Sequence, residues 1–211
     1  MFNICPQCGE YSEEKTIDER GPCAICPFCG YAHRFERLPL FLVTGASGSG
    51  KSTLGLALVP RLRECVVMES DILWRPEFDT PHDGYRAYRT LWLRLAKNIS
   101  QAGKPVVLVG SCVPEQFEGC TERRYFSELH YLALVADDAI LAQRLQARPA
   151  WRNSAAPEVV AAMLTYNRWL REHAGTTTPP MSLLDTSFLT VEQGVDAVIA
   201  WIAQYWPQAL Q

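Results

Sequence analysis

One stretch of the chain has the residue types and spacing of a phosphate-binding loop. The segment 45–53, Gly-Ala-Ser-Gly-Ser-Gly-Lys-Ser-Thr, fits the pattern G-x-x-x-x-G-K-[ST]. Glycines let the backbone curl so that successive N–H groups point at an anion. Lys51 is then expected to reach the β- and γ-phosphates of a nucleotide, and the Ser52 hydroxyl to ligate Mg²⁺. We therefore expect a nucleoside triphosphate, ATP, to bind Gly45, Ala46, Ser47, Gly48, Ser49, Gly50, Lys51, Ser52 and Thr53. The alternative is an ordinary Gly/Ser turn.

A second group of chemically competent residues is formed by cysteines near the N-terminus. Cys5, Cys8, Cys26 and Cys29 lie in two copies of a C-P-x-C-G frame, with the overall spacing C-x₂-C-x₁₇-C-x₂-C. This spacing is typical of a tetrahedral zinc site in a zinc ribbon. Cys23 is a competing thiol outside the frame. The ribbon either has a purely structural role or docks on RNA or protein. Acidic residues outnumber basic ones in this segment, which argues against a nucleic-acid partner.

The elements around the loop determine what faces the phosphates. Leu40–Val43 is predicted to be a buried strand and Lys51 to open a helix. A second strand, Cys65–Met68, is followed by Glu69-Ser70-Asp71. Ligands of open α/β sheets bind outside the carboxyl ends of the strands. Asp71 is therefore our candidate to orient or deprotonate an acceptor hydroxyl and to bind Mg²⁺ through water. Otherwise it only caps the next helical turn.

The segment 72–84 is aromatic and charged, and it follows Asp71 directly. Trp74 and Arg75 are the candidate acceptor-binding residues, although Trp74 could equally anchor the loop on the core. A helix is predicted next, with an apolar stripe at helical spacing that starts at Tyr85 and Tyr88. Arg86 and Arg89 are expected to fall off this stripe into solvent.

The third predicted strand ends without the acid that many P-loop proteins carry there. The strand is predicted over Pro105–Gly110, and its end, Gly110-Ser111-Cys112, consists of small residues that leave room for a substrate. A fourth strand, His130–Val135, leads to a helix capped by Asp137. Arg144 and Arg148 are spaced to share one face of that helix, and Arg152 follows Pro149. We expect these arginines to form a lid over the transferred phosphoryl group, with solvated surface arginines as the alternative.

Together these features resemble the P-loop small-molecule kinases: adenylate-kinase-like, nucleoside-kinase and gluconate-kinase-like proteins. The resemblance covers residues 39–206 and rests on the loop, the acid at Asp71, the helix leading to Arg144 and Arg148, and a last strand ending in Asp185-Thr186. It implies a three-layer α/β fold with a five-stranded parallel sheet in the order 2-3-1-4-5. It also implies that Asp185 and Thr186 border the adenine. A zinc ribbon is outside the usual pattern of this family.

Length and composition are consistent with one large domain and a small appendage. The chain has 211 residues, 48% of them hydrophobic, and a formal net charge of −3. We expect a zinc ribbon over 1–37 and a P-loop domain over 38–211. The start of the chain lacks the features of a signal peptide, and no apolar run is long enough for a membrane span, so we expect a cytoplasmic protein.

The sequence favours an ATP-dependent phosphotransferase that acts on a hydroxyl of a small molecule, nucleoside or sugar-like. Its candidate catalytic residues are Lys51, Asp71, Arg144 and Arg148. The alternative is a nucleotide-dependent switch ATPase whose ribbon docks on RNA or protein. The sequence specifies neither the acceptor nor an oligomeric state.

Overall fold

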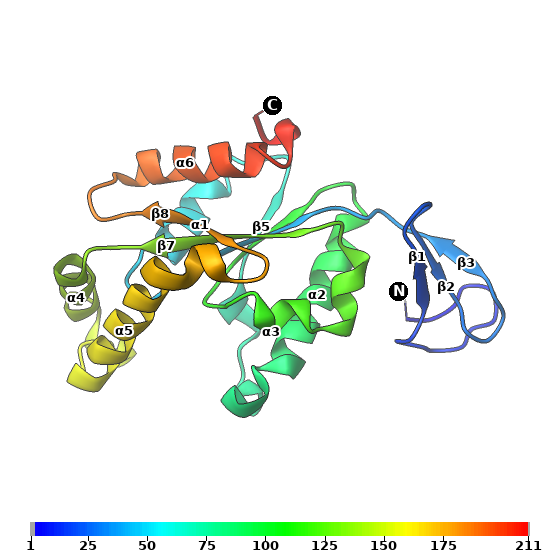
Figure 1. The fold of residues 1–211 in the computed structure, drawn as a ribbon, viewed down its shortest axis with the longest axis horizontal. Helices are drawn as coiled ribbons and strands as arrows, with labels where there is room; N and C mark the ends of the chain where they lie inside the picture. Colours follow the sequence, from blue (N-terminus) through cyan, green and yellow to red (C-terminus); the bar gives the residue numbers. More distant parts are fainter. Residues whose placement is uncertain (1–2, 211) are drawn as a thin grey trace.

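The computed structural model describes residues 3–210, and its centre is a sheet of five parallel strands (Figure 1). These are β4 (Leu40–Gly45), β5 (Val66–Glu69), β6 (Val106–Val109), β7 (Leu129–Val135) and β8 (Met181–Asp185). Their spatial order is β5-β6-β4-β7-β8. Counted along the chain this order is 2-3-1-4-5, so the predicted topology is confirmed. Every residue of β4 is buried, as expected for the central strand of a parallel sheet covered on both faces.

Helices cover both faces of the sheet and complete a three-layer α/β fold. Helices α1 (Lys51–Leu58) and α6 (Val191–Ala203) lie on one face, whereas α2 (Arg86–Ser100), α3 (Glu115–Glu118) and α5 (Pro157–His173) lie on the other (Figure 1). Side chains alternate along a strand, so Leu40 and Leu42 join the core under α2 and α5. Phe41 and Val43 join the core under α1 and α6. No helix within residues 3–210 has the length and apolar character to cross a membrane.

Local signals explain where several helices begin and end. Asp137 opens α4 (Asp138–Gln146) by accepting hydrogen bonds from the amides of Ala139 and Ile140. Thr190 and Gln193 form the predicted capping box of α6. The prediction that Arg148 shares a helix face with Arg144 is wrong, because α4 ends before Arg148. Single-turn 3₁₀ segments make up most of the connections: η1 (Ser70–Leu73), η2 (Pro76–Phe78), η3 (Pro81–Asp83), η4 (Thr121–Tyr125), η5 (Ala150–Arg152), η6 (Ala174–Thr176) and η7 (Pro207–Leu210).

The N-terminal segment forms a separate small sheet, and we call residues 3–37 the ribbon. Strands β1 (Thr16–Asp18), β2 (Cys23–Ile25) and β3 (Ala32–Arg34) pair antiparallel in that order. Each C-P-x-C-G frame closes a tight turn: Gly9 donates its amide to the Cys5 carbonyl at 2.9 Å, and Gly30 donates to Cys26 at 3.0 Å. Both glycines have positive φ, 78° and 73°. The glycine of the frame is therefore required by the backbone conformation.

The ribbon packs against α2 and η4 through a charged network. Lys97 of α2 and Glu122 of η4 form an ion pair at 2.5 Å, and each side chain is only 3% exposed. Arg94 also pairs with Glu122, at 2.9 Å, and with Glu13 of the ribbon. Asn3 accepts a hydrogen bond from Lys97 at 3.0 Å. Two buried charges are tolerated here because each has an opposite charge and further hydrogen bonds.

Because Lys97 is buried, removing the charge of its partner should destabilise the fold strongly. We expect Glu122→Gln to lower the free energy of unfolding by about 3 kcal/mol, measured by urea denaturation. Glu19→Gln is the matched control, since Glu19 is exposed and pairs with Arg37 at 3.2 Å. Its effect should stay below about 1 kcal/mol. Equal effects of the two substitutions would contradict a structural role for the buried pair.

Candidate functional site

The phosphate-binding loop joins β4 to α1 in a conformation that only glycine adopts easily. Gly45, the last residue of β4, has a φ of 146°, and a Cβ there would lie 2.4 Å from the carbonyl oxygen of Leu134 on β7. Gly50, immediately before α1, has a φ of 98°. The loop therefore lies directly against the neighbouring strand. It also directs the first amides of α1 toward the cavity above the sheet, where they favour an anion.

Lys51 is the first residue of α1, and its ammonium lies within the loop. Its Nζ donates to the carbonyls of Gly45 at 2.7 Å and Ala46 at 3.0 Å. Burial lowers the pKa of Lys51 to about 8; the Asp71 carboxylate opposes this shift, and the Arg148 guanidinium adds to it. The residue as a whole is partly buried, and its charged end is desolvated. Lys51 thus presents a cation that would gain stability from a bound phosphate.

Oxygen ligands for a divalent cation lie beside the loop. The Ser52 hydroxyl donates a hydrogen bond to the Glu69 carboxylate at the end of β5. Asp71 follows two residues later in η1. These hydroxyl and carboxylate oxygens are the kind of donor that Mg²⁺ prefers. The residues present therefore fit the predicted magnesium role of Ser52 and add Glu69 to it.

A cavity of about 300 Å³ lies above the loop and has the charge expected of a phosphate site. Lys51, Ser52, Asp71, Arg148 and Arg152 are among its lining residues. Burial, followed by the nearby charge of Arg152, lowers the pKa of Arg148. Within residues 3–210 neither of these two arginines has a carboxylate at ion-pair distance. The two guanidinium groups thus provide an anion-attracting wall.

Arg144 has a different environment from Arg148. Its guanidinium donates to the side chain of Thr186 at 3.2 Å and to the Thr186 carbonyl at 2.8 Å. Arg144 and Arg148 both line a second cavity, of about 370 Å³, beside the loop. The apolar side chains of Leu54, Leu189 and Val191 complete much of its wall. A nucleobase, which has flat apolar faces and a polar edge, would fit in this cavity.

Of the two residues predicted to border the adenine, the structure brings only Thr186 to this second cavity. Thr186 is buried, and its hydroxyl donates to the Ser49 carbonyl at 2.9 Å. Asp185 is exposed and pairs with Arg171 at 2.9 Å. Hydrogen bonds from Ser187 and the charge of Arg171 outweigh partial burial and lower the pKa of Asp185. The Asp185 side chain supports the loop after β8 and does not line the cavity.

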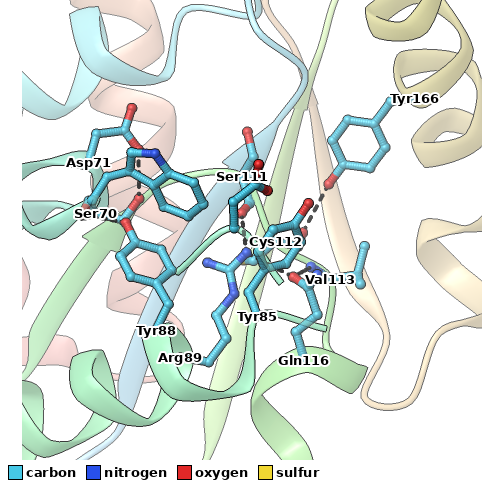
Figure 2. A pocket seen from close by; sticks show the side chains of 12 residues that line it. Ser70, Asp71, Tyr85, Tyr88, Arg89, Ser111, Cys112, Val113, Gln116 and Tyr166 are labelled. Carbon is cyan, nitrogen blue, oxygen red and sulfur yellow. Dashed lines mark hydrogen bonds between the residues drawn. The ribbon is translucent and has the colours of Figure 1, made fainter. Parts of the chain in front are cut away.

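A third cavity, of about 350 Å³, lies on the other side of Asp71 (Figure 2). Asp71 and Ser111 line both this cavity and the phosphate cavity, so the two share a wall. Trp74 lines the third cavity and packs edge-on against Tyr88 at 5.2 Å between ring centroids. Arg75 is exposed and is not among the residues that line any of the three cavities.

Arg89 is a functional candidate that the sequence analysis missed. It was expected in solvent, but it is only 5% exposed and lines the third cavity. Its Nη2 donates to the Ser111 carbonyl at 2.8 Å and to Gln116 at 3.0 Å, and its Nε has no hydrogen-bond partner in the structure. Arg89 follows Tyr85 by four residues, so it lies on the buried stripe. That spacing was the available signal; Arg86 is exposed, as predicted.

Hydrogen bonds from tyrosine side chains to backbone carbonyls hold the walls of the third cavity in place. Tyr88 donates its hydroxyl to the Ser70 carbonyl at 2.6 Å, and Tyr166 of α5 donates to Cys112 at 3.0 Å. Gly110 lies so close to η1 that a Cβ would meet the Ser70 hydroxyl at 1.9 Å. At Gly110 the small strand end thus admits the segment bearing Asp71, while the following Ser111 and Cys112 line the third cavity. Tyr85 has a φ of 61°, an unusual conformation for a bulky residue.

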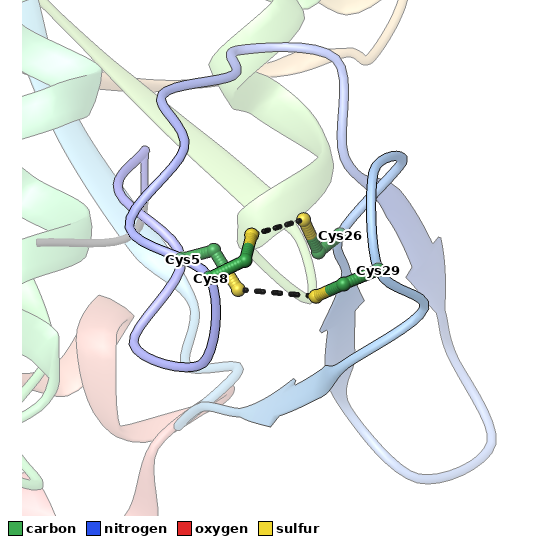
Figure 3. A group of neighbouring side chains, drawn as sticks. All are labelled: Cys5, Cys8, Cys26 and Cys29. Carbon is green, nitrogen blue, oxygen red and sulfur yellow. Dashed lines mark hydrogen bonds between the residues drawn. The ribbon is translucent and has the colours of Figure 1, made fainter.

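The four predicted zinc ligands converge in the ribbon (Figure 3). The sulfur atoms of Cys5, Cys8, Cys26 and Cys29 all lie within 4.8 Å of one another. Cys5 and Cys29 are 3.6 Å apart, and Cys8 and Cys26 are 3.8 Å apart. Tetrahedral zinc with Zn–S bonds of about 2.3 Å needs sulfur atoms about 3.8 Å apart. The four thiols are thus arranged as ligands of a zinc ion, and Cys23 is outside the cluster.

Comparison with known structures identifies the fold. A sugar kinase from Janibacter sp. HTCC2649 matches with a TM-score of 0.59 at 15% identity, over 83% of this chain and 99% of that one. The tunicamycin resistance protein of Deinococcus radiodurans matches with a TM-score of 0.57 at 20% identity, over 79% and 96%. A gluconokinase from Sinorhizobium meliloti 1021 matches with a TM-score of 0.52 at 21% identity, over 82% and 94%.

These identities are low, so the structures establish a shared fold and not a shared substrate. A comparison with curated proteins finds no match. At the level of sequence, residues 42–159 match the family described as the AAA domain. This segment runs from β4 through the phosphate-binding loop to the start of α5 and includes most of the residues that line the phosphate cavity and the third cavity. Since the match covers more than half of the chain, the protein belongs to the AAA-domain family of P-loop proteins, with the fold of the small-molecule kinases.

Proposed function

We propose that the protein is an ATP-dependent kinase that transfers the γ-phosphate to a hydroxyl group of a small molecule. The observation that carries this proposal is the wall shared by two cavities. Asp71 and Ser111 face both the phosphate cavity and the aromatic cavity beside α2. A hydroxyl bound in the aromatic cavity would lie next to a phosphoryl group bound above Lys51. Such proximity supplies much of the catalysis in phosphoryl transfer.

Each part of ATP has a matching region. The base fits the cavity of Leu54, Leu189 and Thr186, and the phosphates fit the loop amides, Lys51 and the paired guanidinium groups of Arg148 and Arg152. Ser52 and Glu69 would hold Mg²⁺, which neutralises phosphate charge when bound. Arg144, held by Thr186, would position the loop around the base rather than touch the transferred group.

Asp71 is placed to act on the acceptor. In the proposed step the acceptor oxygen attacks the γ-phosphorus, a new O–P bond forms, and the bond to the β-phosphate oxygen breaks to release ADP. The hydroxyl proton passes to the Asp71 carboxylate as the new bond forms. The neighbouring Ser70 hydroxyl donates to this carboxylate at 3.2 Å and would keep it oriented.

The acceptor cavity favours a molecule with both an apolar face and oxygen-rich groups. Trp74, Tyr85 and Tyr88 provide aromatic surfaces for a sugar or nucleoside ring. Arg89 provides a buried guanidinium that has no carboxylate at ion-pair distance within the described residues. A hydroxyl-bearing molecule with an acidic group, such as a sugar acid, would satisfy this cation best.

We also propose that residues 1–37, which include the ribbon, are a zinc-folded domain and that residues 38–211 are a P-loop domain. We propose that the protein is cytoplasmic. The convergence of the four thiols supports zinc. The unit is too small to bury a core of its own, and Ala24 and Phe35 instead join the core under α2. Zinc would therefore have a structural role.

The first functional prediction concerns Lys51. Lys51→Ala should weaken ADP binding by at least about a hundredfold without unfolding the chain, because the charged end contacts only loop carbonyls. Isothermal titration calorimetry measures the affinity, and thermal denaturation checks the fold. Unchanged affinity would disprove the phosphate-site assignment.

The lowered pKa of Lys51 gives the same prediction a pH signature. The ammonium form binds phosphate, so affinity for ADP should be constant below the pKa of about 8 in the free protein. Above that pH it should fall, by at most about tenfold per unit, because a proton must then be taken up on binding. The Lys51→Ala variant, which lacks this group, should show no such fall and serves as the control.

The second functional prediction separates a kinase from a switch ATPase. A thermal-shift screen of sugars, sugar acids and nucleosides, with ADP and Mg²⁺ present, would identify an acceptor. Asp71→Asn should then leave ADP affinity nearly unchanged and lower acceptor-stimulated turnover by at least about a hundredfold. Glu77→Gln is the control, since Glu77 is an exposed carboxylate near Asp71 that lines none of the three cavities and should retain turnover. Turnover that responds to RNA or protein but to no small molecule would favour the switch.

The zinc assignment predicts about one zinc ion per chain by elemental analysis. A Cys5→Ser/Cys29→Ser double variant removes two of the four ligands and should lose the ion. Cys23→Ser, which changes a nearby thiol outside the cluster, should retain it. Full zinc content in the double variant would show that other residues bind the metal.

A further inference from the structure

The ribbon contacts the same helix that forms the acceptor cavity, but at the opposite end. From the middle of α2 to its C-terminus, Arg94, Lys97 and Gln101 meet the ribbon. Gln101, just after the helix, exchanges two hydrogen bonds with the backbone of Glu36, at 2.8 and 3.2 Å. The arginine pairs with Glu13, and the lysine donates to Asn3.

The opposite end of α2 holds both sides of the acceptor cavity. Tyr88 is bonded to the carbonyl of Ser70, the residue before Asp71, at 2.6 Å. Arg89 is bonded to the carbonyl of Ser111 at 2.8 Å. One turn of α2 is therefore hydrogen-bonded both to the segment that carries Asp71, the proposed general base, and to the wall formed by Ser111. A shift of that turn would shift both walls of the cavity relative to the phosphate site.

Helix α2 is a rigid connection between these two sets of contacts. It has 15 residues, which corresponds to a rod of about 22 Å. Its buried face, with Trp92 and Leu93, packs in the same core as Ala24 and Phe35 of the ribbon. The ribbon thus contacts the helix in two ways, through the polar network and through the shared core.

We propose that the ribbon is a positioning element for the acceptor cavity, acting through Glu13 and Asn3 on Arg94 and Lys97. It places Tyr88 and Arg89 so that an acceptor is held opposite Asp71. The ribbon itself does not touch the acceptor or the nucleotide. The structural half of this inference is independent of the proposed kinase activity, and the half that concerns acceptor binding rests on it.

The test uses the full-length protein with an Asn3→Ala/Glu13→Gln double variant. Asn3→Ala removes the amide oxygen that accepts from Lys97, and Glu13→Gln removes the charge that pairs with Arg94. The Lys97–Glu122 pair and the cysteines stay intact. The control is Glu19→Gln, which removes the same charge from the ribbon without touching α2. Amide hydrogen exchange of α2 and of α6, which lies on the other face of the sheet, is measured for each protein.

We expect exchange in α2, including the turn at Tyr88 and Arg89, to accelerate by roughly tenfold in the double variant. Exchange in α6 and affinity for ADP should stay as in the unmodified protein, and the control should change neither. Unchanged exchange in α2 would overturn the proposal. An equal acceleration in α6 would also overturn it, because the ribbon would then act on global stability.

The functional arm measures steady-state kinetics with the acceptor found in the screen. The double variant should raise KM for the acceptor by about tenfold and leave KM for ATP unchanged. Accelerated exchange without any acceptor-dependent turnover in the unmodified protein would support the positioning role and refute the kinase proposal. Accelerated exchange with an unchanged acceptor KM would overturn the link between the ribbon and the cavity.

Discussion

The close contact between the phosphate loop and strand β7 at Gly45 is the constraint on which the site depends. No side chain fits at that position, because the Leu134 carbonyl lies where a Cβ would be. The loop is therefore held directly against the sheet, and the first turn of α1 is aimed over it. The positions of Lys51 and Ser52, the first two residues of α1, depend on this contact. The Thr186 hydroxyl donates to the Ser49 carbonyl and so joins the segment after β8 to the phosphate loop.

A similar close approach organises the third cavity, where we propose that the acceptor binds. Gly110 lets η1 lie against the end of β6, and this brings Asp71 over the border between two cavities. The sheet order places β6 between β5 and β4, so the segments after all three strands meet at one edge. That order places the phosphate cavity and the third cavity side by side. The chemistry depends on which polar side chains line the common wall.

The parts of the fold and site that follow short-range patterns were predicted from the sequence. The helix caps at Asp137 and Thr190 and the convergence of four cysteines are confirmed. The sheet order, which only the resemblance to the P-loop kinases implied, is also confirmed. The prediction that Arg89 lies in solvent was wrong. Its spacing from Tyr85 places it on the buried face of α2, where packing covers the guanidinium. The position of Arg148 beyond α4 was also missed. The network of Lys97, Glu122 and the ribbon joins distant segments, so no local pattern could indicate it.

The contacts of the ribbon also have a consequence for the order of folding. Lys97 is separated from Asn3 by 94 residues, and Arg124 reaches the Glu13 carbonyl across 111 residues. During synthesis the ribbon emerges before its docking surface on α2 and η4. Contacts between distant segments form slowly because a long loop must close. The ribbon can therefore dock only after α2 and η4 have been made, so the charged network around Lys97 and Glu122 is a late step of folding.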